Sequence, residues 1–204
     1  MLDEDVRLML AFRDGDDAAF DALFERWAGK LLRFLERMVR NEAVAEELVQ
    51  ETFLRVHRAR ARYAPDAKFS TWFYTIASNV ARNELRRPFR RAPHDSTDLE
   101  REEGRPLELA AEESPVDEIV NARREGAEVE AALQLLPERQ RAALWLAAVE
   151  GLPYAEVAAA LETSESSVKA LVHRARVALA DQLANARAKL ATPQKPFLIR
   201  GGAR

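Results

Sequence analysis

Apolar residues recur at three- and four-residue steps along most of the chain, a spacing that predicts helices and not strands. The first long stripe predicts an amphipathic helix over residues 17–40, with the members Phe20, Leu23, Phe24, Trp27, Leu31, Phe34, Leu35 and Met38. Similar stripes predict helices over about 43–61 and 71–87, and a short leading helix over 5–13. These helices are predicted to form one compact N-terminal domain.

The periodic pattern is lost between residues 88 and 126. Four prolines stand there among clustered acidic and small residues: Pro88, Pro93, Pro106 and Pro115. A segment of this composition has too few large apolar side chains to form a core and is typical of a linker. We therefore expect a partly disordered linker, with a helix start near Asp117.

Helical order resumes at about residue 127. The spacing predicts helices near 127–135, 137–150, 153–161 and 165–188. Pro137 and Pro153 stand where first-turn prolines belong, and Gly151 stands where a helix C-cap belongs. The predicted fold is all-α, with two small helical domains joined by a flexible acidic linker. Its parts are an N-terminal domain at 1–91, the linker at 92–126, a C-terminal domain at 127–191 and a flexible tail at 192–204.

The second domain has the layout of a helix-turn-helix. The helix at 153–161 is followed by the turn Glu162-Thr163-Ser164 and a longer helix for which Ser164 is the expected N-cap. In this motif the second helix enters the major groove of DNA by its N-terminal end. Its outward positions are predicted to be Ser166, Ser167, Lys169, Ala170, His173, Arg174 and Arg176. The spacing alone fits an ordinary helical hairpin with a solvated basic face equally well.

The formal net charge of −3 averages over opposed segments. Residues 1–54 carry −6 and residues 93–126 carry −7, whereas residues 55–92 carry +8 and residues 127–204 carry +2. A polyanion meets a local patch and not the chain average, so the +8 segment is a candidate for nucleic-acid binding. We expect the acidic segments at 1–54 and 93–126 to shield this patch in the free protein.

Several classes of protein are disfavoured by what the sequence lacks. There is no cysteine, which rules out disulfides, cysteine zinc sites and thiol nucleophiles and fits a cytoplasmic protein. No apolar run approaches the roughly 18–20 residues of a membrane span, and the acidic first five residues are not those of a signal peptide. His57, His94 and His173 are scattered, and no glycine-rich phosphate loop is present. We therefore predict no enzymatic activity, no metal and no cofactor.

Seven motifs follow one another in a fixed order. The first domain contains Ala45-Glu46-Glu47-Leu48-Val49-Gln50-Glu51-Thr52-Phe53, Phe69-Ser70-Thr71-Trp72, Ile76-Ala77-Ser78-Asn79 and Arg86-Arg87. The second contains Leu136-Pro137-Glu138-Arg139-Gln140, Gly151-Leu152-Pro153-Tyr154-Ala155-Glu156-Val157-Ala158 and Ser167-Val168-Lys169-Ala170-Leu171-Val172-His173-Arg174-Ala175-Arg176. Together they resemble the bacterial RNA polymerase sigma factors, specifically the small two-domain extracytoplasmic-function (ECF) group of the sigma-70 family. At Pro153 and Ser166-Ser167 the sequence departs mildly from the residues that are commoner in this family, and these departures bear on which promoter is read.

The resemblance implies a factor that binds core RNA polymerase, directs it to promoters through −10 and −35 elements and helps to open the DNA. The outward face of the second long helix has members at i, i+3, i+4 and i+7, which are Glu47, Gln50, Glu51 and Leu54. In similar proteins this face binds the clamp helices of the largest polymerase subunit, and the polymerase flap is a further contact. The resemblance also implies an anti-sigma factor as partner, a monomer when free, and no insertion into the membrane.

The resemblance assigns DNA contacts to both domains. Single-stranded DNA at the −10 element is expected to meet Tyr63, Lys68, Ser78, Asn79, Arg82, Asn83 and Arg86, with Tyr63 and Asn79 helping to enclose a flipped base. Trp72 and Phe73 are expected in the core, because their spacing matches that of Phe69 and Ile76. Duplex DNA at the −35 element is expected to meet the seven outward positions of the helix-turn-helix.

Two other functions remain open from the sequence. One is a stand-alone helix-turn-helix transcriptional regulator with a dimerising or ligand-sensing N-terminal domain. The basic, aromatic end of residues 17–91 argues against a closed ligand pocket there. The other is a protein that binds polymerase without DNA, which the basic second helix of the C-terminal domain disfavours.

Overall fold

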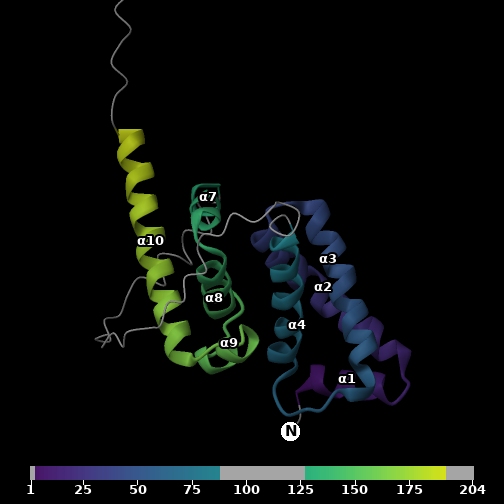
Figure 1. Cartoon of the computed structure of the whole chain (residues 1–204). Helices are drawn as coiled ribbons and strands as arrows, with labels where there is room; N and C mark the ends of the chain where they lie inside the picture. The colour runs from purple at the N-terminus through teal and green to yellow at the C-terminus, as the bar shows by residue number, and fades with distance from the viewer. Residues whose placement is uncertain (1–2, 88–126, 192–204) are drawn as a thin grey trace, which may run out of the picture.

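The computed structural model describes residues 3–87 and 127–191, and the regular elements in these two stretches are all helices. The N-terminal half contains α1 (Glu4–Arg13), α2 (Asp17–Val39), α3 (Glu42–Ala59), the 3-10 turn η1 (Arg60–Arg62) and α4 (Phe69–Leu85). The C-terminal half contains α7 (Ala127–Leu135), α8 (Glu138–Ala148), α9 (Tyr154–Ala160) and α10 (Glu165–Ala191) (Figure 1). The all-α prediction is confirmed here. The predicted linker at 92–126, the helix start near Asp117 and the tail at 192–204 lie outside the described residues.

Local hydrogen bonds explain where the first long helices begin and end. The side chain of Asp16 accepts from the N–H of Ala18 at the start of α2, and Asn41 accepts from the N–H of Val44 at 3.1 Å at the start of α3. Between them Arg40 adopts a left-handed conformation with φ of 59° and closes α2. These caps explain why the helices of the N-terminal half end within two residues of their predicted bounds.

Two prolines of the C-terminal half lie one position before the first helical residue, and not in the first helical turn as predicted. Pro137 and Pro153 have ψ near 145–148° and form the N-caps of α8 and α9, so they are not in the first helical turn. A proline there still suits the helix, because the cap position needs no helical backbone. The helix starts themselves move by only one residue.

An aromatic cluster fills the core of the N-terminal half. Trp27 of α2 packs against Phe69, Phe73 and Tyr74 of α4, with ring centroids 5.1–5.9 Å apart. Phe69, Phe73 and Tyr74 are fully buried, and Trp72 is partly buried against the same core. The prediction that Phe73 and Trp72 belong to the core is confirmed.

One member of the apolar stripe of α2 lies at the surface. Phe24 is 43% exposed and packs on Phe53 with ring centroids 4.7 Å apart, so it lies at the edge of the core. The eight apolar residues of α2 span a wider arc than its neighbours cover, and Phe24 lies at the edge of that arc. Periodicity alone does not say how wide the covered arc is.

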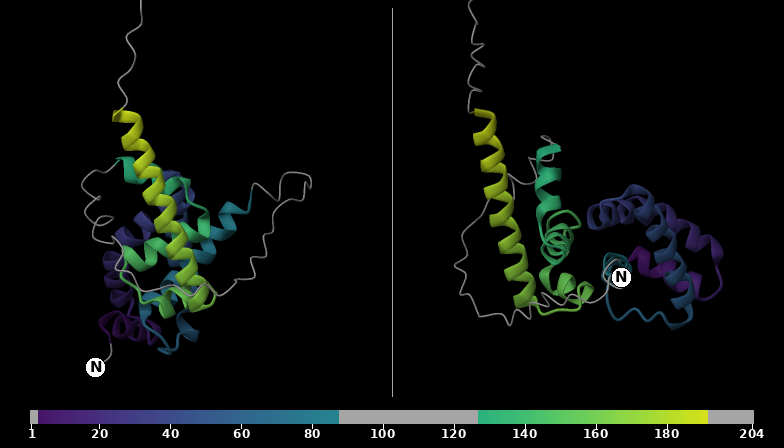
Figure 2. Two further views of the ribbon diagram at one scale, coloured as in Figure 1. Left: turned by 90° about the vertical axis from the view of Figure 1, so that its left-hand side faces the viewer. Right: turned by 45° about the horizontal axis from the view of Figure 1, so that its top comes forward.

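The C-terminal half is built around the predicted helix-turn-helix. Val157 of α9, Leu161 just after it, and Val168 and Val172 of α10 are buried together with residues of α8. In Figure 2, α10 lies on the side of this half that faces away from α1–α4. Within 3–87 and 127–191, no helix has the length and the apolar character needed to cross a membrane.

The two halves pack directly against each other. Helix α9 lies along α4, and α8 contacts α2 (Figures 1 and 2). At the centre of this interface Arg141 of α8 is only 4% exposed. Its guanidinium donates to the carbonyl oxygen of Leu136 in its own half and to that of Met38 in α2, both at 3.1 Å. Burial lowers the pKa of Arg141, and the nearby Arg40 lowers it further.

Replacing Phe73 by alanine tests the aromatic core. We expect Phe73→Ala to lower the free energy of unfolding of the N-terminal half by about 3–5 kcal/mol, because it empties a fully buried site. Phe24→Ala is the matched control and should cost about 1 kcal/mol, since the ring is already partly in water. Urea unfolding followed by circular dichroism and tryptophan fluorescence measures both. Equal losses would contradict the packing.

Candidate nucleic-acid interface

A network of serine hydroxyls organises the start of α10. The Oγ of Ser164 accepts from the N–H of Ser167 at 3.2 Å and donates to the Oγ of Ser167 at 2.9 Å. The carbonyl oxygen of Ser164 accepts from the N–H of Val168 at 3.0 Å, which begins the helix. The prediction that Ser164 caps this helix is confirmed. The first turn is thereby fixed on the body of the C-terminal half by the buried Val168.

The predicted −35 residues form one face of α10. Ser166, Lys169, His173 and Arg174 are exposed, and Ser167, Ala170 and Arg176 are half-buried. Lys169 pairs with Glu165 one turn earlier at 3.4 Å, and the Nε of Arg174 donates to the carbonyl oxygen of Ala170 at 3.4 Å. This face combines small polar side chains near the helix start with cationic ones farther along. Such a face can place its first turns in a major groove and its cations on phosphates.

The seven predicted −10 residues fall into three groups. Lys68, Asn83 and Arg86 are exposed; Asn79 and Arg82 are half-buried; Tyr63 and Ser78 are buried. Tyr63 is 4% exposed, its ring lies 4.9 Å from that of Trp72, and burial raises the pKa of its hydroxyl. Ser78 lines a small cavity with Phe34, Met38 and Leu161, between the two halves. Neither side chain is open to DNA in this arrangement, and their roles stay predictions.

A carboxylate from the turn of the helix-turn-helix accepts hydrogen bonds from two of the predicted −10 residues. Glu162 lies in the turn after α9, with φ of 52°. It accepts a hydrogen bond from the Nδ2 of Asn79 at 3.0 Å and another from Arg82 at 3.3 Å. These two hydrogen bonds favour the ionised form, so the pKa of Glu162 is lowered.

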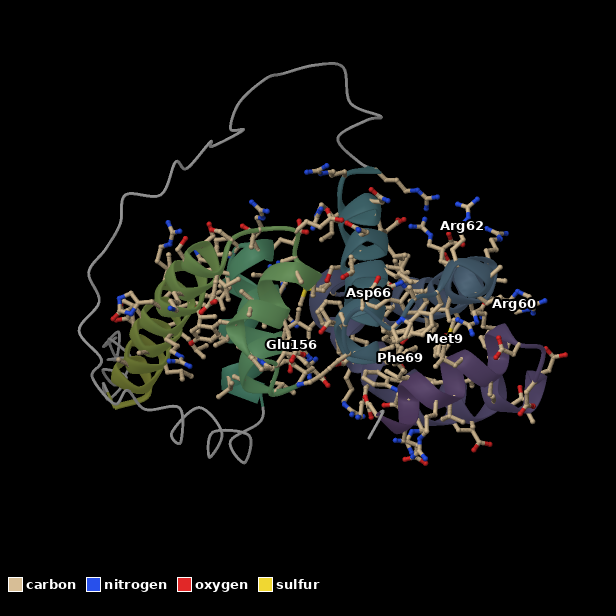
Figure 3. All side chains as sticks on the ribbon, turned by 90° about the horizontal axis from the view of Figure 1, so that it is seen from below. Met9, Arg60, Arg62, Asp66, Phe69 and Glu156 are labelled. Carbon is tan, nitrogen blue, oxygen red and sulfur yellow. The ribbon has the colours of Figure 1, made fainter. Side chains whose placement is uncertain are left out.

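A second carboxylate contacts the other end of α4. Glu156 of α9 accepts from the Oγ1 of Thr71 at 3.0 Å and pairs with the Nζ of Lys68 at 2.7 Å. The hydrogen bond and the charge of Glu156 raise the pKa of Lys68. Figure 3 shows Glu156 where the C-terminal half meets the N-terminal half. Sequence reasoning missed both glutamates, because a contact across more than 80 positions leaves no local signal.

The candidate polymerase face lies on α3, on the surface. Glu47 and Gln50 are exposed, and Leu54 is 49% exposed. Glu51 is half-buried and accepts from the Nε of Arg55 at 2.7 Å. The side chains of this face are therefore available to a partner, with one large apolar group among the polar ones.

Potential metal ligands do not cluster in the structure. Among residues 3–87 and 127–191, no group of three or more histidine, aspartate or glutamate side chains is placed to hold a metal ion.

Comparison with known proteins identifies both halves. The model of "Sigma-70 region 2" matches residues 23–91, and that of "Sigma-70, region 4" matches residues 126–179. The chain is similar to the RNA polymerase sigma factor CarQ of Myxococcus xanthus, with 39% identity over 81% of this chain and 90% of CarQ. It is also similar to the ECF RNA polymerase sigma factor SigE of Mycolicibacterium smegmatis, with 36% identity over 83% of this chain and 65% of SigE. A solved structure of CnrH in complex with the cytosolic domain of CnrY has a TM-score of 0.65 and 25% identity, over 90% of this chain and 99% of CnrH.

The fold and the two family matches are thus those of a sigma-70 factor with regions 2 and 4. More narrowly, the chain belongs to the ECF group of RNA polymerase sigma factors. Proteins of this family bind core RNA polymerase and promoter DNA and start transcription without being enzymes themselves. The hypothesis of a stand-alone helix-turn-helix regulator is set aside, because region 2 accounts for the N-terminal half.

Removing the cap of α10 tests how this helix is held. We expect Ser164→Ala to lower local stability at the start of α10 by about 1 kcal/mol, because the N–H of Ser167 loses its acceptor. Amide hydrogen exchange over the first turns of α10 measures this loss. Ser166→Ala is the control and should stay within about 0.5 kcal/mol. Equal exchange in the two variants would show that the Ser164 hydroxyl does not stabilise the first turn of α10.

Proposed function

We propose that Glu47, Gln50, Glu51 and Leu54 of α3 form the surface that binds the clamp helices of the largest polymerase subunit. The proposal is supported by the exposure of three of these side chains and by the position of α3 inside region 2. Acidic groups around one exposed leucine suit a basic, partly apolar helix pair, because the charges steer docking and the leucine buries apolar area. The polymerase flap is the proposed second contact, made by the C-terminal domain.

The −10 element is proposed to be read by the loop after η1 and by α4. Asn83 and Arg86 are exposed at the end of α4. The guanidinium of Arg86 can contact the backbone of a single strand there, and the amide of Asn83 can form hydrogen bonds with it. Asn79 and Arg82 precede them on the same helix and become available when Glu162 moves away. Tyr63 and Ser78 then require a local rearrangement to reach a flipped base.

The −35 element is proposed to be read by the start of α10. Ser166, Ser167, Ala170 and His173 lie nearer the expected base edges, and Lys169, Arg174 and Arg176 are placed for phosphates. The hydroxyl network at Ser164 fixes the direction in which this helix points. Helices docked in this way read bases with their first turns.

The remaining assignments concern the division of the chain and its partners. We place region 2 at 1–91, a linker at 92–126, region 4 at 127–191 and a tail at 192–204. CnrH was solved with the cytosolic domain of CnrY, which supports a protein regulator, an anti-sigma factor, for this chain as well. The proposed location is the cytoplasm, where core polymerase acts, and the free protein is proposed to be a monomer.

The observation that carries the proposal is one chain with three separate surfaces: an acidic α3, a basic end of α4, and a face of α10 with serines at its start and cations farther along. Run-off transcription tests it. Core RNA polymerase and a supercoiled library of the source genome are incubated with and without this protein. New transcripts are expected only with the protein. A stable dimer that protects a palindromic site without polymerase would contradict the proposal.

Reversing two charges on α3 tests the polymerase surface. Glu47→Lys with Glu51→Lys places like charge against a basic clamp, which costs several kcal/mol. At about 1.4 kcal/mol per decade, affinity for core polymerase should fall by roughly a hundredfold or more. Folding should change little, although the new lysine beside Arg55 costs a few tenths of a kcal/mol. Fluorescence anisotropy of labelled protein with core polymerase measures the affinity.

The matched control for this variant reverses two exposed acids elsewhere. Glu25→Lys with Asp181→Lys changes the net charge by the same amount but lies on α2 and α10. It should keep polymerase affinity within about threefold, because exposed charges at a distance are screened by salt. If the α3 variant, shown to be folded by circular dichroism, binds polymerase as well as the control does, then α3 is the wrong face.

Removing one arginine from α10 tests the assignment of phosphate contacts. Arg174→Ala should weaken binding of the holoenzyme to −35 duplexes by a similar factor for all sequences. It should also reduce the slope of log affinity against log salt by about one, because one phosphate contact is lost. Titrations at several salt concentrations with a set of −35 variants measure both quantities. A change of base preference at a single position would assign Arg174 to a base instead.

A further inference from the structure

We propose that Glu156 and Glu162 form an internal latch that holds α9 over α4 in the free protein and keeps the −10 surface from DNA. The inference rests on the proposed role of α4 in binding the −10 strand. It gives a role to Glu156 and Glu162, two acidic residues of the helix-turn-helix that belong neither to the predicted −35 residues nor to the predicted polymerase-binding residues. The polymerase then has to separate the two halves before the −10 strand can bind.

The contacts of the latch are specific. Glu162 accepts from Asn79 at 3.0 Å and from Arg82 at 3.3 Å, and Glu156 pairs with Lys68 at 2.7 Å. Three of the seven predicted −10 residues are therefore bonded to carboxylates of the C-terminal half. A fourth, Ser78, is buried under the same half beside Leu161.

The register of α4 explains why the two uses exclude each other. Thr71, Ser78 and Arg82 are spaced by seven and four residues, so they lie on one side of the helix, and Asn79 is next to Ser78. This side faces α9, whereas Phe69 and Phe73 point into the N-terminal core. DNA and α9 thus compete for a single side of α4.

The chemistry of the latch matches that of the expected ligand. A carboxylate and a phosphate are both oxyanions that accept hydrogen bonds from arginine, lysine and asparagine side chains. Glu156 and Glu162 supply acceptors to Lys68, Asn79 and Arg82, and the phosphates of a DNA backbone would otherwise supply these acceptors. They also place negative charge where a polyanion would approach, which repels it.

The latch is built to open. The side chain of Glu162 is 54% exposed and that of Lys68 is 59% exposed, so water and salt screen both pairs. Elsewhere in the described interface Arg141 is buried, Arg37 of α2 pairs with Glu130 of α7, and a small cavity lies next to Ser78. An interface of this kind is suited to separate when a larger partner binds both halves.

The absence of cysteine makes the opening measurable in the full-length protein. Spin labels are attached at Ala61→Cys and Ala180→Cys, two exposed positions in opposite halves, and their distance is measured by pulsed electron resonance. The latch variant carries Glu156→Lys with Glu162→Lys, so that like charges meet across α4. The control is again Glu25→Lys with Asp181→Lys, which has the same net charge. Circular dichroism checks that both variants are folded.

We expect the latch variant to show a longer and broader label distance than the parent, and the control to match the parent. Affinity for a fluorescein-labelled single strand of random sequence should rise roughly tenfold over the control, because the donors of α4 are released and like charges now repel α9. The milder pair, Glu156→Gln with Glu162→Gln, should give about a threefold gain over Glu25→Gln with Asp181→Asn. The neutral pair adds no cation, so its gain cannot come from new contacts to DNA.

The two readouts separate failure of the latch from failure of the proposed function. A label distance that stays the same in the latch variant would overturn the latch and leave the role of α4 untouched. A longer distance with no gain in strand binding over the control would overturn the proposed DNA role of α4. Adding Arg86→Ala to the open variant supplies a further check, because strand affinity should then fall if α4 binds the strand.

Discussion

Helix α4 is packed on two sides, and the arrangement of the whole molecule follows from this. One side inserts Phe69 and Phe73 against Trp27 in the N-terminal core. The other presents polar side chains, among them Asn79 and Arg82, to the C-terminal half. Any partner of the polar side must therefore take the place of α9.

Arg141 links the two halves through carbonyl oxygens and, in the described part of the chain, without a carboxylate partner. Its guanidinium donates to carbonyl oxygens near the C-terminal ends of two helices, Met38 in α2 and Gln134 in α7. Such carbonyls lack partners within their own helix and carry the negative end of the helix dipole, so a cation suits them. Burial without a carboxylate is costly for the charge, which is why its pKa is lowered. When the halves separate, water can solvate both the guanidinium and the carbonyl of Met38, so the bond ties the halves together without making their contact irreversible.

Much of the fold could be predicted from sequence because the signals that set it are local. Apolar periodicity and caps such as Asn41 and Ser164 fix helix ends within a few residues. The exposure of Phe24 and the burial of Tyr63 could not be predicted, since both depend on how far neighbouring helices reach. The shielding of the basic segment by residues 1–54 and 93–126 stays a prediction, because residues 93–126 lie outside the described residues. In the described residues, Glu156 and Glu162 of the net-positive C-terminal part cover α4.

The C-terminal half has two electrostatic faces. Lys169, His173 and Arg174 of α10 are exposed, whereas Glu156 of α9 and Glu162 of the turn after it pair with Lys68 and Arg82 of the N-terminal half. The glutamates meet cations of the N-terminal half, and the net charge of +2 over residues 127–204 describes neither face. In the proposed open state, the glutamates lose their partners and the donors of α4 gain exposure together. Because α4 and α2 both contact the C-terminal half directly, the proposed opening has to break the α4–α9 and the α2–α8 contacts together.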